Sequence, residues 1–334
     1  MSQKIAIIIL NWNGLENSRE CLISLKKITY PSYKIIFIDN GSKINEAEIL
    51  AKEFQSHFSE IRFIRNEKNL GFAQGNNQGI TEALKDQEVG YVCTLNNDTI
   101  VELNFLDEAI KKFLDPQIGM IAMKVINYYE QNKIDSLGMT LTQSGLTFNN
   151  KIQNTNDKLQ NIFCPCGSAA LYSRQLLEKC FINENEYFDK DFFCYAEDFD
   201  LGFRGRLAGF DCLLADEAIV YHKVSASTSE KSDLAVFYTY RNICWTLIKD
   251  LPFILWLKYL PKIIIGQLLI IFLYFLRRKY FLILKSYFSV LTKLGKMLAK
   301  RKTIQKNRQI SVKELEKLFT KGILVKEYLK NLKI

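Results

Sequence analysis

Short apolar runs alternate with helix-like segments over the first 124 residues, and this alternation constrains the fold more than any other feature of the chain. The run at 5–10, IAIIIL, is typical of a strand buried on both faces. The alternation predicts an α/β fold with a doubly wound, mostly parallel sheet. The expected strands lie at 5–10, 34–38, 61–64, 91–95 and 118–123, and the expected helices at 15–27, 45–57, 72–84 and 103–114.

Charge is distributed unevenly along the chain. The net charge is +9, but residues 277–334 carry 17 Lys or Arg and three acids, so the preceding part is mildly acidic. A uniformly basic protein would suggest nucleic acid as a partner, whereas an acidic body with a basic tail suggests a local electrostatic contact. We therefore expect no nucleic-acid partner.

Polar side chains follow the predicted strands, at the sheet edge where such folds bind ligands. The first group is Asn11 and Asn13, and the second begins with Asp39. A carboxylate at Asp39 is suited to accept from the imide of a pyrimidine base or from a ribose hydroxyl. An Asx turn is the alternative, since Asp caps loops of this kind routinely.

The segment 69–79 opens a predicted helix with Asn69, Gly71 and Asn77. Its glycines allow close approach of a phosphate to a helix N-terminus, and close helix–sheet packing explains them nearly as well. Asn96, Asn97 and Asp98 follow the next strand. Asp98 is either a helix N-cap or an oxygen ligand for a divalent cation that bridges a diphosphate.

Three acids begin a predicted helix at 197–208, and a lone His222 ends a predicted strand at 218–222. Asp200 pairs with Arg204 at helical spacing, which leaves Glu197 and Asp198. A carboxylate beside an acceptor hydroxyl can act as a general base, although the helix dipole also favours acids there. His222 is either a structural residue or a metal ligand.

The order of these motifs is more specific than any one of them. The segments IIILNWNG at 7–14, IDNGS at 38–42, NLGFAQGNN at 69–77, LNNDT at 95–99 and YAEDFDL at 195–201, followed by His222, resemble glycosyltransferase family 2, particularly its rhamnosyltransferase-like members. The likeness covers residues 4–245. It implies a GT-A fold and an inverting glycosyltransferase that uses a nucleotide-diphosphate donor.

The resemblance also implies roles for single residues. Asp39 would contact the nucleotide base, Asp98 and His222 would bind Mg²⁺ or Mn²⁺, and Asp198 would be the catalytic base of a Glu-Asp motif that includes Glu197. Asn96 stands where the family's metal motif has its first Asp, so one negative charge is missing there. The remaining residues of the donor site would be Asn11, Asn13, Asn69, Gly71, Asn77, Asn97 and Arg241.

The predicted domains are a GT-A catalytic domain at 1–228, with donor and acceptor halves at 1–124 and 125–228, and a helical C-terminal region at 229–334. Residues 251–276 are strongly apolar, but the longest uncharged stretch has 14 residues against about 20 needed to span a bilayer. Aromatic and basic residues around it suit a segment lying in the interface. A helical hairpin packed on the catalytic domain or on a second copy is the alternative, and a homo-oligomer stays open.

The expected partners are a dTDP- or UDP-sugar, with L-rhamnose as the first choice by resemblance, and a glycan or polyprenyl-linked acceptor at the cytoplasmic face of the membrane. Two rivals remain. A nucleotidyltransferase would need a basic, Gly-rich loop where this chain has Asn11–Gly14, and an inactive membrane-attached binding module would not need the acids at 39, 98 and 198.

Overall fold

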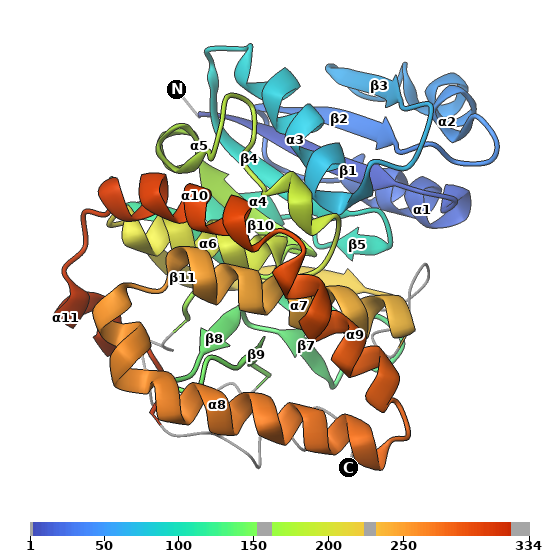
Figure 1. The fold of residues 1–334 in the computed structure, drawn as a ribbon. Coiled ribbons are helices and arrows are strands. Elements are labelled where there is room, and N and C mark those ends of the chain that lie inside the picture. Colours follow the sequence, from blue (N-terminus) through green and yellow to red (C-terminus); the bar gives the residue numbers. More distant parts are fainter. Residues whose placement is uncertain (1–2, 152–161, 224–231, 322–334) are drawn as a thin grey trace.

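A computed structural model describes residues 3–151, 162–223 and 232–321 of the chain. Its centre is a nine-stranded sheet in the order β3-β2-β1-β4-β10-β6-β11-β5, with β7 paired to β6. Figure 1 shows the sheet between two layers of helices. The strands are β1 Lys4–Asn11, β2 Tyr33–Asp39, β3 Ile61–Arg65, β4 Val89–Asn96, β5 Thr99–Val101, β6 Ile118–Asn127, β7 Ile134–Ser136, β10 Ala169–Ser173 and β11 Asp211–His222.

The predicted α/β fold with a mostly parallel sheet is confirmed. Strands β1, β2, β3 and β4 pair in parallel, as do β6 and β11, whereas β10 runs antiparallel between β4 and β6. A small separate sheet, β8 Met139–Leu141 with β9 Thr147–Asn149, lies below it (Figure 1). Because β1 alternates sides, Ile5, Ile7 and Ile9 enter one core cluster while Ala6 and Ile8 enter the other.

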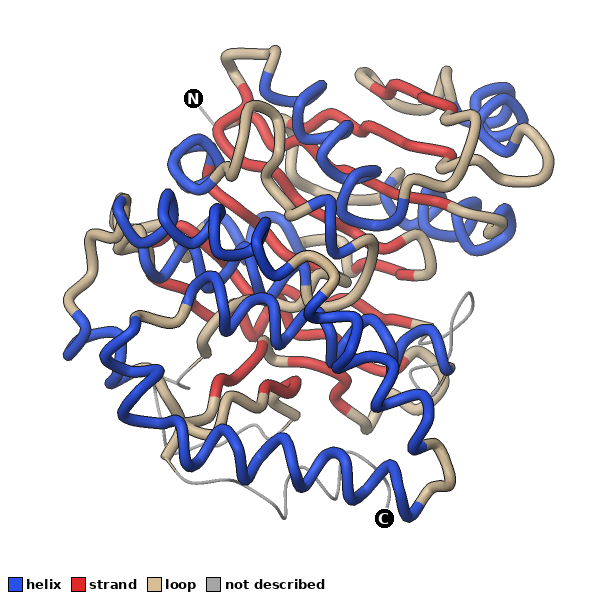
Figure 2. The backbone as a smooth tube through the Cα atoms, in the orientation of Figure 1, coloured by secondary structure: helices blue, strands red, loops and turns tan. Residues whose placement is uncertain are grey.

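Helices cover both faces of the sheet, as the tube in Figure 2 shows. The core on one face includes residues of α1, α2 and α4, and the core on the other includes residues of α3, α5 and α6. These helices are α1 Leu15–Leu25, α2 Glu46–Phe54, α3 Gly71–Leu84, α4 Phe105–Ile110, α5 Arg174–Cys180 and α6 Glu197–Leu207, with a short 3-10 turn η1 at Lys190–Phe192. Helix α4 is shorter than the predicted 103–114.

The C-terminal region is helical, as predicted. Its helices are α7 Asp233–Asp250, α8 Phe253–Leu276, α9 Tyr280–Leu291, α10 Leu294–Lys306 and α11 Val312–Lys317. Residues of α7 and α8 join the core cluster that contains Ala6 and Ile8, so this region packs on the catalytic part. A smaller cluster of its own is formed by residues of α7, α8 and α9 together with Leu146. The boundary predicted at 228 and the end of the basic tail, 322–334, lie outside the described residues.

Candidate active site

The carboxyl ends of β1, β2 and β4 bring the predicted donor residues together. Asn11 lies opposite Asp39 in the β1–β2 register, and Leu10 lies opposite Asn96 in the β1–β4 register. The Asn97 side-chain amide donates to Oδ1 of Asn11 at 2.9 Å. The Asn11 amide in turn donates to Oε2 of Glu46 at 2.7 Å. Glu46, at the start of α2, was not singled out from the sequence because only the fold places it under this loop.

Asp39 is fully buried, and its carboxylate caps the loop that follows β2. It accepts from the backbone N–H groups of Ser42 and Glu46 at 2.9 and 3.0 Å. These are the contacts expected for the Asx turn, the alternative role of Asp39. The contact of Asp39 with a nucleotide base stays a prediction. Asn13 has a left-handed φ of 52° and accepts from the Lys43 N–H at 2.9 Å, which ties the two loops together.

The start of α3 packs against the loop at 187–196, which precedes the acid pair Glu197 and Asp198 and is called the acidic loop below. Gly71 has φ +82°, and an added Cβ would lie 2.5 Å from the Phe193 carbonyl oxygen, so glycine is required there. Asn69 accepts from the Gly71 N–H at 2.8 Å. The Asn77 amide both donates to and accepts from the backbone of Phe188, at 2.8 Å each. In this arrangement Asn77 joins α3 to the acidic loop. Its contact with the sugar-nucleotide donor stays a prediction.

Asp98 and His222 are brought together by the pairing of β5 with β11, which sets His222 opposite Thr99. Oδ1 of Asp98 lies 3.1 Å from Nε2 of His222, and the Asn96 amide lies 3.5 Å from the same nitrogen. Burial alone would raise the pKa of Asp98, but the hydrogen bond and charge of His222 outweigh it and hold that pKa below its ordinary value. The Asp98 carboxylate and the Asn96 carbonyl oxygen are the kind of ligand that Mg²⁺ and Mn²⁺ prefer, and the His222 imidazole is a further candidate ligand.

The acid pair at the start of α6 is held on a strained turn. Tyr195 and Ala196 have φ of 66° and 61°, which non-glycine residues rarely adopt and which recur at functional sites. Asp198 accepts from the Gly167 N–H at 2.6 Å and from its neighbour Phe199 at 2.7 Å. Burial raises the pKa of Asp198, and the N–H donors offset this only in part.

Glu197 is almost fully buried, and its Oε2 has no hydrogen-bond partner among the residues described. Burial, with the charge of Asp198 next to it, raises the pKa of Glu197 well above its ordinary value. Burial favours the uncharged form of both acids, whereas the N–H donors of Gly167 and Phe199 favour the charged form of Asp198.

A short chain of contacts connects the acid pair with the Asp98–His222 pair. The Asn96 N–H donates to the Ser168 carbonyl at 3.0 Å, and the adjacent Gly167 N–H donates to Asp198. A Cβ on Gly167 would lie 3.1 Å from Oδ2 of Asp198, so the missing side chain leaves room for that carboxylate. The two groups predicted to carry the chemistry are therefore connected through the backbone of residues 167 and 168.

Arg241 and Asn242 of α7 hydrogen-bond to backbone carbonyls of the acidic loop. The Asn242 amide donates to the carbonyls of Phe192, Cys194 and Tyr195 at 3.1, 2.9 and 2.7 Å. Arg241 donates to the Phe192 carbonyl at 3.0 Å, and its guanidinium lies 4.2 Å from the Trp245 ring centroid. The hydrogen bonds of Arg241 use its Nε and Nη2, and its contact with the donor diphosphate stays a prediction.

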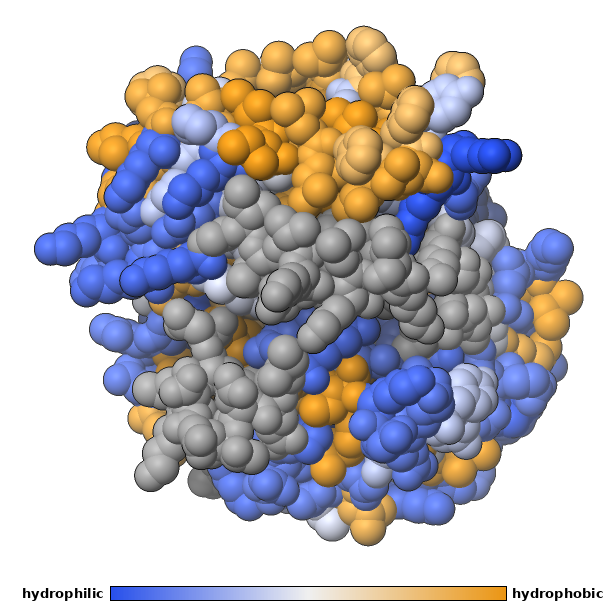
Figure 3. Space-filling view, turned by 90° about the horizontal axis from the view of Figure 1, so that it is seen from below, coloured by the Kyte–Doolittle hydropathy of each residue, from blue (hydrophilic) through white to orange (hydrophobic). Residues whose placement is uncertain are grey.

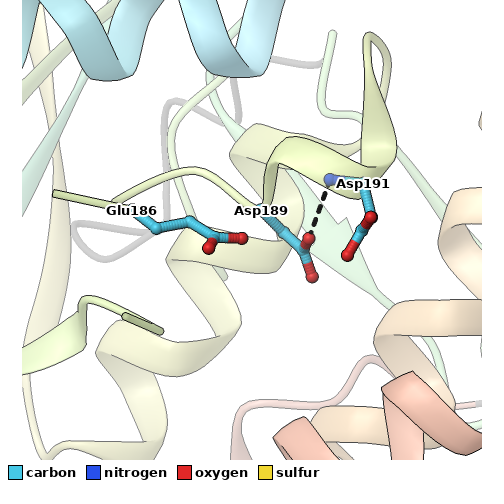
Figure 4. A group of neighbouring side chains, drawn as sticks. All are labelled: Glu186, Asp189 and Asp191. Carbon is cyan, nitrogen blue, oxygen red and sulfur yellow. Dashed lines mark hydrogen bonds between the residues drawn. The ribbon is translucent and has the colours of Figure 1, made fainter. Parts of the chain in front are cut away.

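Three further carboxylates lie close enough to share a cation, namely Glu186, Asp189 and Asp191 (Figure 4). The Lys300 ammonium bonds all three of them, and Lys249 lies 2.6 Å from Asp189. Because protein ammonium groups already neutralise these acids, we assign the cluster to structure and not to metal binding.

Comparison with known proteins shows the family of the chain. The model of the family described as glycosyl transferase family 2 matches residues 6–181, more than half of the 334-residue chain. Glycosyltransferase GlyG of Streptococcus pneumoniae serotype 4 is 27% identical over 135 residues, which make up 40% of this chain and 42% of GlyG. A poly-beta-1,6-N-acetyl-D-glucosamine synthase of Staphylococcus epidermidis is 30% identical over 120 residues, 35% of this chain and 27% of the synthase. The chain thus spans less than half the length of either relative.

The fold has solved counterparts as well. The mannosyltransferase PcManGT of Pyrobaculum calidifontis, solved with GDP-Man and Mn²⁺, superposes with a TM-score of 0.53 and 13% identity over 90% of this chain and 86% of its own. That likeness confirms the predicted GT-A fold. The family match ends at 181, before the acid pair and His222, so the roles of those residues rest on the geometry above. Sequence and fold together show that the chain belongs to glycosyl transferase family 2.

Proposed function

We propose that the protein is an inverting glycosyltransferase that moves a sugar from a nucleotide diphosphate to an acceptor hydroxyl, with Asp198 as general base. The observation that carries the proposal is the contact chain from Asn96 through Ser168 and Gly167 to Asp198. It connects the group suited to a cation with the group suited to accept a proton, which supports a shared role. Both are needed when a diphosphate leaves and a hydroxyl attacks.

Asp98 and His222, with Asn96 beside them, would hold the divalent cation. When bound, the cation neutralises charge on the leaving diphosphate. Asn96 offers a carbonyl oxygen in place of a carboxylate, so the protein supplies only one formal negative charge to the cation from this group. We infer that the cation binds tightly only together with the nucleotide.

Asp198 would take the proton of the acceptor hydroxyl as that oxygen attacks the anomeric carbon. The bond to the diphosphate oxygen breaks in the same step, so the configuration at the anomeric carbon inverts. The raised pKa of Asp198 makes it a better proton acceptor than a fully solvated Asp. The two N–H donors from Gly167 and Phe199 fix the direction of the carboxylate.

The donor we propose first is dTDP-L-rhamnose, on the resemblance of the motifs at 7–14, 38–42, 69–77 and 195–201 to rhamnosyltransferase-like sequences. A UDP-sugar is the next candidate. Family membership argues against the nucleotidyltransferase alternative, and the presence of Asp39, Asp98, Asp198 and His222 together argues against an inactive binding module.

The acceptor we propose is a growing glycan on a polyprenyl carrier at the cytoplasmic face of the membrane. One relative is named as a synthase of a poly-N-acetylglucosamine glycan, which favours a cell-surface polysaccharide pathway. The apolar C-terminal helices favour a membrane-bound acceptor, since they would keep the enzyme where such a carrier lies.

A ligand screen tests the proposal without knowledge of the acceptor. The melting temperature of the purified chain is measured with UDP-, dTDP- and GDP-sugars, each with and without Mn²⁺. A ligand that binds only the folded state raises that temperature by mass action. We expect one nucleotide class to do so in the presence of Mn²⁺ and much less after EDTA. No shift with any nucleotide sugar would contradict the proposed function.

A further inference from the structure

Helices α8 and α9 expose a continuous apolar surface. The view from below in Figure 3 shows hydrophobic side chains gathered along one edge of the molecule, with hydrophilic ones at either end. In α8 and α9 the exposed large apolar residues have 39–76% of their surface in solvent. They are Phe253, Ile254, Leu257, Ile264, Ile265, Leu268, Phe272, Phe275 and Leu276 of α8 and Tyr280, Phe281, Leu284, Phe288 and Leu291 of α9.

The opposite side of α8 is packed against the protein. Its buried positions recur at helical spacing, from Leu255 and Tyr259 through Ile263 and Gly266 to Ile270. A Cβ on Gly266 would lie 2.9 Å from the Ser144 carbonyl oxygen, so the helix rests closely on the loop between β8 and β9.

By length and composition α8 is apolar enough to cross a bilayer, yet only 33% of its most apolar 18-residue window is buried in the protein. Crossing would require the helix to leave its packed position. Lys258, which pairs with Glu316, and Lys262, which donates to Gln143 at 2.6 Å, would then enter hydrocarbon or lose these partners. A helix lying flat keeps both its buried contacts and its charged side chains near water.

Charge around the surface is of one sign. Residues 253–291 contain six basic residues, Lys258, Lys262, Arg277, Arg278, Lys279 and Lys285, and no acidic residue. The acidic partners of Lys258 and Lys279 come from other elements, and both lysine side chains are more than 40% exposed. Such exposed ion pairs are weak in water and leave the lysines available to a second anion.

We propose that α8 and α9 form a monotopic docking surface that lies flat on an anionic lipid bilayer. The exposed apolar side chains enter the boundary between headgroups and acyl chains, and the six basic residues face the anionic headgroups. This inference rests on the membrane location proposed above. It does not depend on the transfer reaction, so a chain that does not bind lipid can still transfer sugar, and an inactive chain can still bind lipid.

A second copy of the chain is the main alternative to the bilayer as the partner of this surface. In a symmetric dimer the same patch meets itself, and the six positive charges of one copy would face those of the other with no acid from this surface between them. Anionic lipid complements the charge that a second copy would repel. The charge pattern therefore favours the bilayer.

Flotation of the purified full-length chain with lipid vesicles tests the proposal. Vesicles of phosphatidylcholine alone are compared with vesicles that contain about 30% phosphatidylglycerol as the anionic lipid. The double variant Leu268→Glu/Phe272→Glu places charge in the middle of the apolar face. Leu114→Glu is the matched control, since Leu114 is 86% exposed and follows α4 on the other face of the sheet.

We expect the wild-type chain and Leu114→Glu to float with the anionic vesicles, and the double variant to bind at least about tenfold less. In Lys262→Glu/Lys285→Glu, binding should fall only on anionic vesicles, by about fivefold or more for each lysine. Equal binding of the wild type and the Leu268/Phe272 variant would overturn the proposal.

Size measurement by light scattering separates the second copy from the bilayer. All variants must also keep the wild-type melting temperature, which excludes unfolding as the cause of lost binding. A wild-type dimer that the Leu268/Phe272 variant converts to a monomer, without vesicle binding by either, would contradict the lipid assignment and support an interface between copies.

Discussion

The carboxylate of Asp98 lies 3.1 Å from Nε2 of His222, although the two residues come from separate strand ends. The pairing of β5 with β11 sets His222 opposite Thr99, and the Lys223 N–H donates to the Asp98 carbonyl at 3.0 Å. The contact is therefore fixed by backbone hydrogen bonds. A site held in this way is pre-organised for the cation that the proposed reaction requires.

His222→Ala should raise the Mn²⁺ concentration needed for half-maximal activity by at least about tenfold, because second-shell partners of metal ligands already cost about that much when they are removed. Titration of activity with Mn²⁺ at saturating donor measures this. His57→Ala is the control, since His57 is the other histidine of the chain and is exposed. Equal Mn²⁺ dependence of the two variants would remove His222 from the metal site.

The rate should fall as the pH decreases through the raised pKa of Asp198. Only the deprotonated carboxylate accepts a proton, and burial holds its pKa above the ordinary 3.8. With Mn²⁺ saturating at every pH, the acid limb of the kcat profile should therefore lie above pH 3.8. An acid limb at or below that value would show that a solvated carboxylate, and not Asp198, is the base.

Asn242→Ala should lower kcat by at least about tenfold with a smaller change in KM, because the amide holds the carbonyls of Phe192, Cys194 and Tyr195. The loss of these bonds should also lower the free energy of unfolding by about 1–3 kcal/mol. A looser loop admits water to the acid pair, so the acid limb should move toward lower pH. Lower stability with kcat and the pH profile unchanged would mean that Asn242 is purely structural.

Lys249→Met should destabilise the fold by about 3–5 kcal/mol, since it removes the buried ammonium that Asp189 and Asp200 share and leaves each acid with one cation, Lys300 or Arg204. Urea unfolding measures the change. Lys258→Met is the matched control, because its ion pair with Glu316 is largely exposed and should be worth less than about 1 kcal/mol. Comparable losses in the two variants would contradict the structural role of the buried cluster.

Local pattern predicted the sheet well. The run at 5–10 is apolar at every position, and the structure buries its two sides in separate core clusters. The same pattern predicted that the polar residues after β1, β2 and β4 lie together, since parallel strands end at one edge of the sheet. The three-residue strand β5 was missed, because so short a segment has no readable period and lies directly after the Asn96–Asp98 motif.

The support of the acidic loop had no local signal at all. Asn77 contacts Phe188 across 111 residues, and Lys300 contacts Asp189 across 111. The sequence shows only an Asn in a glycine-rich helix and a Lys in a basic tail. Asp39 illustrates a different difficulty. The same sequence pattern fits a turn cap and a nucleotide contact, and the structure shows the contacts of the turn cap.

The most direct test of the account compares Asp198→Asn with Glu197→Gln in kcat, with donor affinity measured for both. Burial favours the uncharged form of Glu197, which Gln resembles in shape and charge, whereas Asn at position 198 cannot take up the acceptor proton. We predict that Asp198→Asn loses about 10²–10⁴-fold in kcat with unchanged donor binding, and that Glu197→Gln stays within about tenfold of the wild type. Near-normal turnover in Asp198→Asn would contradict the assignment of Asp198 as the base.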